Sequence, residues 1–178
     1  MPSAFSHALV GAAIGSSAPE SRPSWLLPVF AALAAAPDLD VIGLHLGVPY
    51  AHPLGHRGLS HSLVFAAVLA LVSIPFWTRV VDEHARRLAF LTFLAVGSHG
   101  FLDAFTDAGH GIGLLVPLVD ERYFAPWRPI LTSPLSVRSF FSGSGVTILA
   151  NEAVYVGLPT ALVLVVRGAA ARVRRRTD

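Results

Sequence analysis

A histidine and two aspartates lie within one long apolar segment of the sequence, where ionisable side chains are costly to place. His99, Asp103 and Asp107 follow one another at four-residue intervals. At the centre of a membrane helix, a carboxylate costs about 2.5–3.5 kcal/mol on insertion scales, so it needs a partner or a wet site. At about 100° per residue the three side chains fall within an arc of about 80°. One helix face can therefore present an imidazole and one or two carboxylates to a single cation.

Two more histidines stand immediately before another apolar run. His56 and His61 are five residues apart, which puts their side chains about 140° from each other on an ideal helix. Both rings can face one centre only if Gly58, which lies between them, bends the chain. We predict Ser60 as the N-cap of the helix that follows. A pair of loop histidines that bind nothing is the alternative for this segment.

Asp38 and Asp40 lie at the end of an earlier apolar run. We expect Pro37 to stop that helix, and two carboxylates separated by one residue converge only in a turn. A solvated turn without a ligand is the alternative. His7 is the sole ionisable residue of the first apolar run. On its own it would be an interfacial histidine. Because successive helices cross the membrane in alternating directions, we expect His7 on the same side as the other motifs.

Together these side chains form one set of potential metal ligands. The sequence contains no cysteine, so a thiolate site is excluded. A mixture of imidazoles and carboxylates suits zinc best, with manganese or iron as alternatives. The set is larger than one tetrahedral ion requires, so we expect one or two ions. The predicted metal ligands are His7, Asp38, Asp40, His56, His61, His99 and Asp103.

Two ions bound close together would favour phosphoester hydrolysis, because they lower the pKa of a bound water and clamp the attacking and leaving oxygens. Arg57 can bind a phosphate through its forked guanidinium. Arg128 is a second candidate for this role, with an interfacial anchor as the alternative. We predict hydrolysis of a phosphoester or a lipid headgroup by a metal-activated water, with catalytic roles for Asp40, Arg57 and Asp107.

The composition is that of a membrane protein. Of the 178 residues, 53% are apolar and 13% are charged, and the mean hydropathy is +0.61, far from the values of an ordinary soluble domain. Because a spanning helix needs about 20 mostly apolar residues, we expect one integral membrane domain over residues 1–178. We predict an all-α fold, a polytopic membrane helix bundle of about four to five helices with a metal site at one membrane face. The predicted helices are residues 5–18, 25–36, 63–81, 88–107 and 146–166, and the first two form a hairpin that need not span fully.

Prolines, arginines and aromatic residues mark residues 109–145 as an interfacial loop, because this composition breaks helices and favours the bilayer surface. Nine of the 13 arginines lie in the 19–24 turn, the 78–87 turn and the basic tail 167–178. Positively charged flanks stay in the cytoplasm, so we expect a multi-pass inner membrane protein with a cytoplasmic C-terminus. If successive helices alternate in direction from this cytoplasmic C-terminus, the histidine and aspartate motifs lie on the non-cytoplasmic face. The expected partners are the lipid bilayer and a lipid or phosphorylated substrate, with no nucleic acid.

A cleaved signal peptide is the alternative for the first 36 residues. Arg22, the apolar run from Trp25 and the alanines at 34–36 imitate its three regions. The 21 residues before Arg22 are themselves largely apolar, which is unusual for the charged beginning of such a peptide. We therefore favour a helical hairpin here.

The order of these motifs resembles the YdjM-like family of membrane-bound metal-dependent hydrolases. The resemblance implies a distant similarity to the all-helical fold of zinc phospholipase C and P1 nuclease, with helix-borne histidine and aspartate ligands around clustered zinc. A substrate does not follow from a fold, and the region after Pro117 matches no part of the family pattern. The resemblance covers residues 6–117 and rests on His7, on Asp38 and Asp40 after Pro37, on His56, Arg57 and Gly58 with His61 and Ser62, on His99 followed by Asp103, and on Thr106 with Gly109.

Two other classes of function remain open from the sequence. In a haem or metal-ion carrier, His61 and His99 on adjacent helices would be axial or transport ligands, although the several carboxylates argue against haem. In a non-catalytic membrane adaptor, the polar residues would only hold helices together. The absence of a His-Glu-x-x-His motif argues against a zinc protease of that class.

Overall fold

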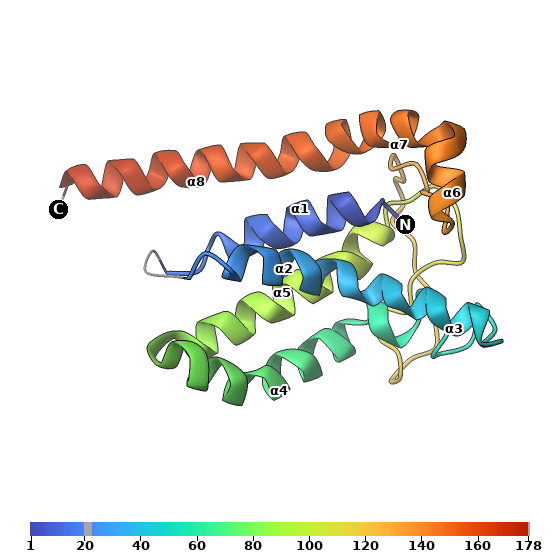
Figure 1. Cartoon of the computed structure of the whole chain (residues 1–178), viewed down its shortest axis with the longest axis horizontal. Helices are drawn as coiled ribbons and strands as arrows, with labels where there is room; N and C mark the ends of the chain where they lie inside the picture. The colour runs from blue at the N-terminus through green and yellow to red at the C-terminus, as the bar shows by residue number, and fades with distance from the viewer. Residues whose placement is uncertain (20–22, 178) are drawn as a thin grey trace.

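The computed structural model describes residues 1–19 and 23–177, and over this part of the chain it confirms an all-helical fold (Figure 1). Two antiparallel helix pairs form the body of the molecule, α1 (Ala4–Gly15) with α2 (Leu26–Ala35) and α4 (Leu63–Val81) with α5 (Ala85–Asp103), and a long helical segment runs above them. Short 3-10 helices cover Ala36–Asp40, Leu59–His61 and Asp82–His84. The α-helices are α1 (Ala4–Gly15), α2 (Leu26–Ala35), α3 (Val41–His45), α4 (Leu63–Val81), α5 (Ala85–Asp103), α6 (Val137–Ser139), α7 (Gly145–Glu152) and α8 (Leu158–Thr177).

Small residues let α1 and α2 pack with their backbones close together. A Cβ added to Gly11 would clash with the Phe30 carbonyl oxygen and with the Ala34 Cβ. Phe30 is itself fully buried and stacks on Trp77 of α4 with 5.9 Å between the ring centroids. The Trp77 Nε1–H donates to the Thr92 hydroxyl at 3.2 Å. One aromatic cluster therefore joins the two helix pairs.

Helix α5 is the central helix of the bundle. Eleven of its residues are buried, more than in any other described helix. Three described segments are long and apolar enough to cross a membrane, namely Leu26–His45, Leu63–Val81 and Phe140–Arg176. The segment predicted at 88–107 is not among them. The reason is physical: a helix surrounded by other helices does not need a lipid-facing apolar surface, so α5 can carry polar residues.

Of three local predictions from the sequence, one is confirmed in part and two are wrong. The α-helix before Pro37 ends at Ala35 as expected, but Pro37 lies in the first turn of the 3-10 helix Ala36–Asp40, where the missing N–H is not needed. The helical chain continues through α3 to His45. Helix α5 ends at Asp103, so Asp107 lies outside the helix. The α4 cap is Ser62, whose hydroxyl accepts the Phe65 N–H at 2.9 Å, and not Ser60.

The loop predicted at 109–145 is shorter at its end, because helical structure begins at Val137. Residues 104–136 fold over the end of the bundle as an irregular segment. Backbone hydrogen bonds fasten this segment at Leu63 N to Leu114 O (2.9 Å) and at Ser133 N to Met1 O (2.9 Å). The predicted tail is also helical as far as Thr177. Part of the predicted 19–24 turn, including Arg22, and the last tail residue lie outside the described residues.

The polar motifs and the basic tail lie at opposite ends of the molecule. The N-terminus, α3 and α6 share one end, and the C-terminus of α8 lies at the other (Figure 1). The sequence motifs with histidine and aspartate are all carried at the first of these ends, by α1, the Ala36–Asp40 helix, the segment before α4 and the end of α5.

Replacing Gly11 by alanine is expected to destabilise the protein by about 1–3 kcal/mol, because the new methyl group overpacks the α1–α2 contact. The matched control is Gly168→Ala in α8, where an added Cβ meets no atom within 4 Å. Thermal unfolding in detergent measures both. Equal midpoints for the two variants would contradict the close packing described for α1 and α2.

Candidate metal centre

The predicted ligands converge at one end of the bundle, although they come from four separate parts of the chain. Helix α1 carries His7, the Ala36–Asp40 helix carries two aspartates, the segment before α4 carries two histidines, and α5 carries His99 and Asp103. Six of the seven predicted ligands form three overlapping groups in which the ligand atoms lie within 4.8 Å of one another. These groups are His7 with Asp38 and His99, Asp38 with His56 and His61, and His61 with His99 and Asp103.

Two imidazole nitrogens face each other at the middle of this cluster. The Nδ1–H of His99 donates to the Ala34 carbonyl at 2.7 Å, which leaves Nε2 for the centre. The Nε2 atoms of His99 and His61 are 3.1 Å apart, and the Asp38 Oδ1 lies 3.1 Å from the His99 nitrogen. The Asp103 Oδ2 lies 3.6 Å from His61 Nε2. A hydrogen bond that fixes the outer nitrogen and aims the inner one at a shared centre is the usual orientation of metal-binding histidine.

Asp40 lies behind the imidazoles rather than among them. Its Oδ1 accepts the Nδ1–H of His56 at 2.6 Å, and its Oδ2 lies 3.1 Å from the His61 Nδ1. The Ser60 hydroxyl also donates to Oδ2, at 2.6 Å. Asp40 is the predicted ligand that none of the three groups contains. Its geometry is that of a carboxylate that orients two histidines.

Several buried polar atoms of the cluster have no hydrogen-bond partner within the described chain. They include both ring nitrogens of His7, the Oδ2 of Asp38 and both carboxylate oxygens of Asp103. His7 stacks on His99 with 3.6 Å between the ring centroids, and its Nε2 lies 3.3 Å from Asp103 Oδ1 without hydrogen-bond geometry. Buried polar groups are normally satisfied. Lone pairs of imidazole and carboxylate that gather in this way fit the donor set of a divalent cation.

The backbone at Arg57 joins the two predicted aspartate and histidine motifs. Arg57 has a φ of 64°, which is the left-handed region that residues with a side chain adopt rarely. In this conformation its N–H donates to Asp40 Oδ2 at 3.3 Å, and its carbonyl accepts the Gly113 N–H at 2.8 Å. Such strained positions persist where the surrounding structure requires them.

The side chain of Arg57 is buried and makes contacts within the protein. Its Nη1 donates to the Ala108 carbonyl at 2.9 Å and its Nη2 to the Thr106 hydroxyl at 3.0 Å. Its Nε lies 3.4 Å from Asp103 Oδ2. Gly109 has a φ of 100°, and a Cβ there would lie 2.5 Å from Arg57 Nη1. These contacts hold the 106–109 turn against the cluster, which is a positioning role and differs from the predicted phosphate contact.

Asp107 and Arg128, two further residues singled out from the sequence, lie apart from the ligand groups. Asp107 is exposed, and its Oδ1 accepts hydrogen bonds from the Thr132 N–H and hydroxyl at 2.8 and 2.7 Å. It therefore stabilises the loop. The Arg128 guanidinium lies 4.7 Å from the centre of the Phe124 ring, and the phosphate contact and the interfacial anchor both stay predictions.

Comparison with known proteins places the chain in a family. The sequence pattern of the YdjM inner membrane protein family matches residues 1–175. The chain belongs to the YdjM family. The inner membrane protein YbcI of Escherichia coli (strain K12) is 35% identical over 165 residues, which cover 92% of this chain and 95% of that relative. No solved structure matches the chain.

Membership of the YdjM family confirms the family resemblance and the membrane class that the sequence predicted. It extends the likeness beyond residue 117, because the match runs to residue 175 and so includes the loop and the C-terminal helices. The relative's description as an inner membrane protein agrees with the three segments long and apolar enough to span a bilayer. The predicted similarity to zinc phospholipase C and P1 nuclease stays a prediction.

One buried carboxylate of this YdjM-family protein was missed in the sequence. Glu152 in α7 is 2% exposed, and its Oε2 accepts the hydroxyls of Ser3 and Ser6 at 2.5 and 2.7 Å. Its Oε1 accepts the Ser3 N–H. The signal for it was a lone acidic residue within an apolar run, which needs a polar partner inside the protein. Glu152 fixes the start of α1, which carries His7.

The charges around His61 favour its protonated form. Burial alone lowers the pKa of His61, but hydrogen bonds to Asp38 and Asp40 and the nearby charge of Asp103 raise it from 6.5 to about 9. A group whose pKa rises on folding stabilises the fold below its unfolded pKa and loses that contribution as the pH rises through the folded pKa. The contribution of His61 is therefore complete below about pH 6.5 and disappears above about pH 9.

Chelator-treated protein is thus expected to lose thermal stability between about pH 6.5 and about pH 9, because the stabilising contribution of the proton on His61 is lost there. His61→Gln should flatten this part of the profile, and His45→Gln, at an exposed histidine outside the cluster, should keep it. Unfolding midpoints in detergent across this pH range measure the effect. A His61→Gln profile identical to that of the wild type would contradict the assigned proton.

Proposed function

We propose that this YdjM-family protein is a membrane-embedded metal-dependent hydrolase of phosphoesters, with zinc as the ion that its ligands suit best. The observation that carries the proposal is the convergence of the His61 and His99 Nε2 atoms, 3.1 Å apart, with carboxylate oxygens of Asp38 and Asp103 that lack hydrogen-bond partners within the described residues. The overlap of three ligand groups allows one or two ions. Manganese and iron accept the same donors.

A divalent ion held by these residues would supply a Lewis acid that lowers the pKa of water and polarises a phosphoryl oxygen. The residues of the protein itself orient the imidazole rings. Asp40 fixes the rings of His56 and His61 through their Nδ1 atoms. Asp38 keeps 12% side-chain exposure, so among the ligands of the three groups its side chain is the one most accessible from solvent.

The way into the cluster favours an amphiphilic substrate. The imidazoles and Asp103 are almost fully buried, whereas Asp38 and Asp40 keep 12% and 9% exposure. Asp40 and Ser60 line a groove of about 320 Å³ whose other walls are mainly apolar. These walls come from α2, α4 and α5 and include Leu33, Phe65, Leu69 and Val96. A lipid whose chain lies in this groove would bring its headgroup phosphoester to Asp40 at the edge of the cluster, on the 3-10 helix that also carries Asp38.

The same proposal places the cluster on the non-cytoplasmic face of the inner membrane. Arg87, Arg167 and Arg174 line one pocket together, at the end of α8 that points away from the cluster (Figure 1). Positively charged flanks favour the cytoplasm. This orientation supports a substrate in the outer leaflet.

Purified protein is expected to hydrolyse a phospholipid phosphoester, to lose the activity with a chelator, and to recover it with zinc. Asp103→Asn should lower the rate by about 10–100-fold, the usual effect of disturbing a metal site. His45→Ala, at an exposed histidine, is the matched control and should keep the wild-type rate. Release of phosphate or headgroup from lipid in mixed micelles measures the activity. A chelator-insensitive rate, or an unchanged rate in Asp103→Asn, would contradict the proposal.

The proposed role of the groove as the binding site of the substrate's acyl chain leads to a separate prediction. Leu69→Trp fills the groove and is expected to raise the KM for a long-chain phosphoester by about tenfold, an effect of the size expected for loss of an apolar contact. Leu71→Trp, on the exposed side of the same helix, should leave it unchanged. Both variants should hydrolyse a soluble aryl phosphate at the wild-type rate. Equal KM values for Leu69→Trp and wild type on the long-chain substrate would exclude entry through this groove.

A further inference from the structure

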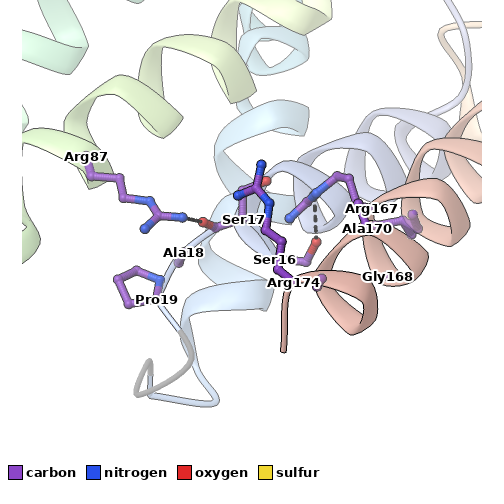
Figure 2. Close-up of a pocket in the computed structure, with 11 residues that line it drawn as sticks. Ser16, Ser17, Ala18, Pro19, Arg87, Arg167, Gly168, Ala170 and Arg174 are labelled. Atoms are coloured by element: carbon purple, nitrogen blue, oxygen red, sulfur yellow. Dashed lines mark hydrogen bonds between the residues drawn. The ribbon is translucent and has the colours of Figure 1, made fainter. Parts of the chain in front are cut away.

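A second site lies at the opposite end of the bundle, where α8 passes the end of α1. A pocket of about 620 Å³ opens there. Arg87 reaches it from the start of α5, and Arg167 and Arg174 reach it from α8, with Ser16 and Ser17 between them (Figure 2). No residue of this pocket belongs to the ligand groups of the metal centre. The site is thus independent of the proposed hydrolysis.

Two of these arginines are held in place by neutral oxygens of α1 and of the residues that follow it. The Arg87 Nη2 donates to the Ser17 carbonyl. The Arg167 Nη1 lies within hydrogen-bond distance of the Ala13 carbonyl at 3.4 Å and of the Ser16 hydroxyl at 3.3 Å. Each of these bonds uses one terminal nitrogen of a guanidinium that carries five N–H donors. The two groups are therefore positioned by the protein and keep donors that can bind a phosphate through their fork geometry.

An apolar groove of about 400 Å³ continues from this pocket, and the two share Ser17 and Arg167. Its lining residues come from α1, from the end of α5, and from the Ala153–Gly157 segment with α8, and α8 runs alongside α1 (Figure 1). Its walls include Val10, Ile14, Phe101, Leu102, Val156 and Val163. The groove borders the Phe140–Arg176 segment, which is long and apolar enough to span the bilayer, so its occupant must be apolar along the groove and anionic at the arginine end.

We infer that this combined site binds an anionic phospholipid as a structural ligand. The phosphate would lie on Arg87 and Arg167, with Arg174 adding positive charge, and an acyl chain would fill the groove between α8 and the helix pair. A phospholipid is the membrane component that combines these two chemistries in one molecule, and basic residues at the membrane surface attract anionic headgroups. Because the acyl chain of the lipid would contact α1, α5 and α8 together, the bound lipid would stabilise the position of α8.

The test is binding of dioleoylphosphatidylglycerol to the full-length protein in detergent, measured by native mass spectrometry against dioleoylphosphatidylcholine. The double variant Arg87→Gln, Arg167→Gln is expected to weaken phosphatidylglycerol binding by about tenfold or more, because it removes two charge-assisted contacts. The matched control is Arg172→Gln, Arg176→Gln, which removes the same charge from the same end of α8 outside the pocket. It should bind within about twofold of wild type.

A second pair of variants tests the groove. Val163→Trp fills it and is expected to reduce binding of both lipids, whereas Leu162→Trp on the neighbouring face of α8 should not, since Leu162 does not line the groove. Equal binding of the two lipids by wild type, or equal loss in the two arginine double variants, would overturn the inference by showing non-specific attraction. A lipid-free dimer that Val163→Trp disrupts would also overturn it, because the groove would then hold a second copy of the chain.

Discussion

The structure depends on how a cluster of buried charges is compensated inside an apolar bundle. Asp103 and the rings of His7, His61 and His99 are almost fully removed from solvent, and an isolated buried carboxylate would be prohibitively costly. Pairing within the cluster supplies part of the compensation, through the raised pKa of His61 and through Arg57 at 3.4 Å from Asp103. Several carboxylate and imidazole atoms still lack hydrogen-bond partners in the described chain, and in the proposed metal-bound state a cation would satisfy them and replace the proton of His61. The need to collect these groups at one end explains much of the surrounding architecture.

Close backbone approach is what brings the groups together. Gly100 of α5 lies so near the His61 carbonyl that an added Cβ would clash with it, and this contact places the His99 and His61 rings edge to face, with 4.5 Å between their centroids. Gly11 does the same for α1 and α2, which positions His7 beside the cluster. On the outer side, Arg122 donates to the carbonyls of His56, Tyr50 and other residues of the loop and so fastens the segment before α4. These contacts hold the helices and loops in the positions that bring the polar side chains together at one end of the bundle.

The sequence allowed the main helices and the set of converging residues to be predicted, because long apolar runs define helices and because ionisable residues inside them need partners. The exact span of α4 was predicted for this reason. Local signals failed where tertiary contacts decide: α2 ends before Pro37 as predicted, but the chain stays helical as the 3-10 helix Ala36–Asp40. The bond between Glu152 and Ser3 joins residues 149 positions apart, and the left-handed backbone of Arg57 follows from its contacts with Asp40 and Gly113. No local pattern carries such information.

The most direct test of the central claim is the metal content of the protein purified from membranes without added metal, measured by inductively coupled plasma mass spectrometry. The double variant His61→Ala, His99→Ala removes the two nitrogens that face each other at 3.1 Å. The control His45→Ala, His52→Ala removes two exposed histidines from the same end. We expect about one to two zinc ions per chain in the wild type and the control, and a stoichiometry near zero in the His61 and His99 variant. Equal metal content in all three proteins would contradict the account.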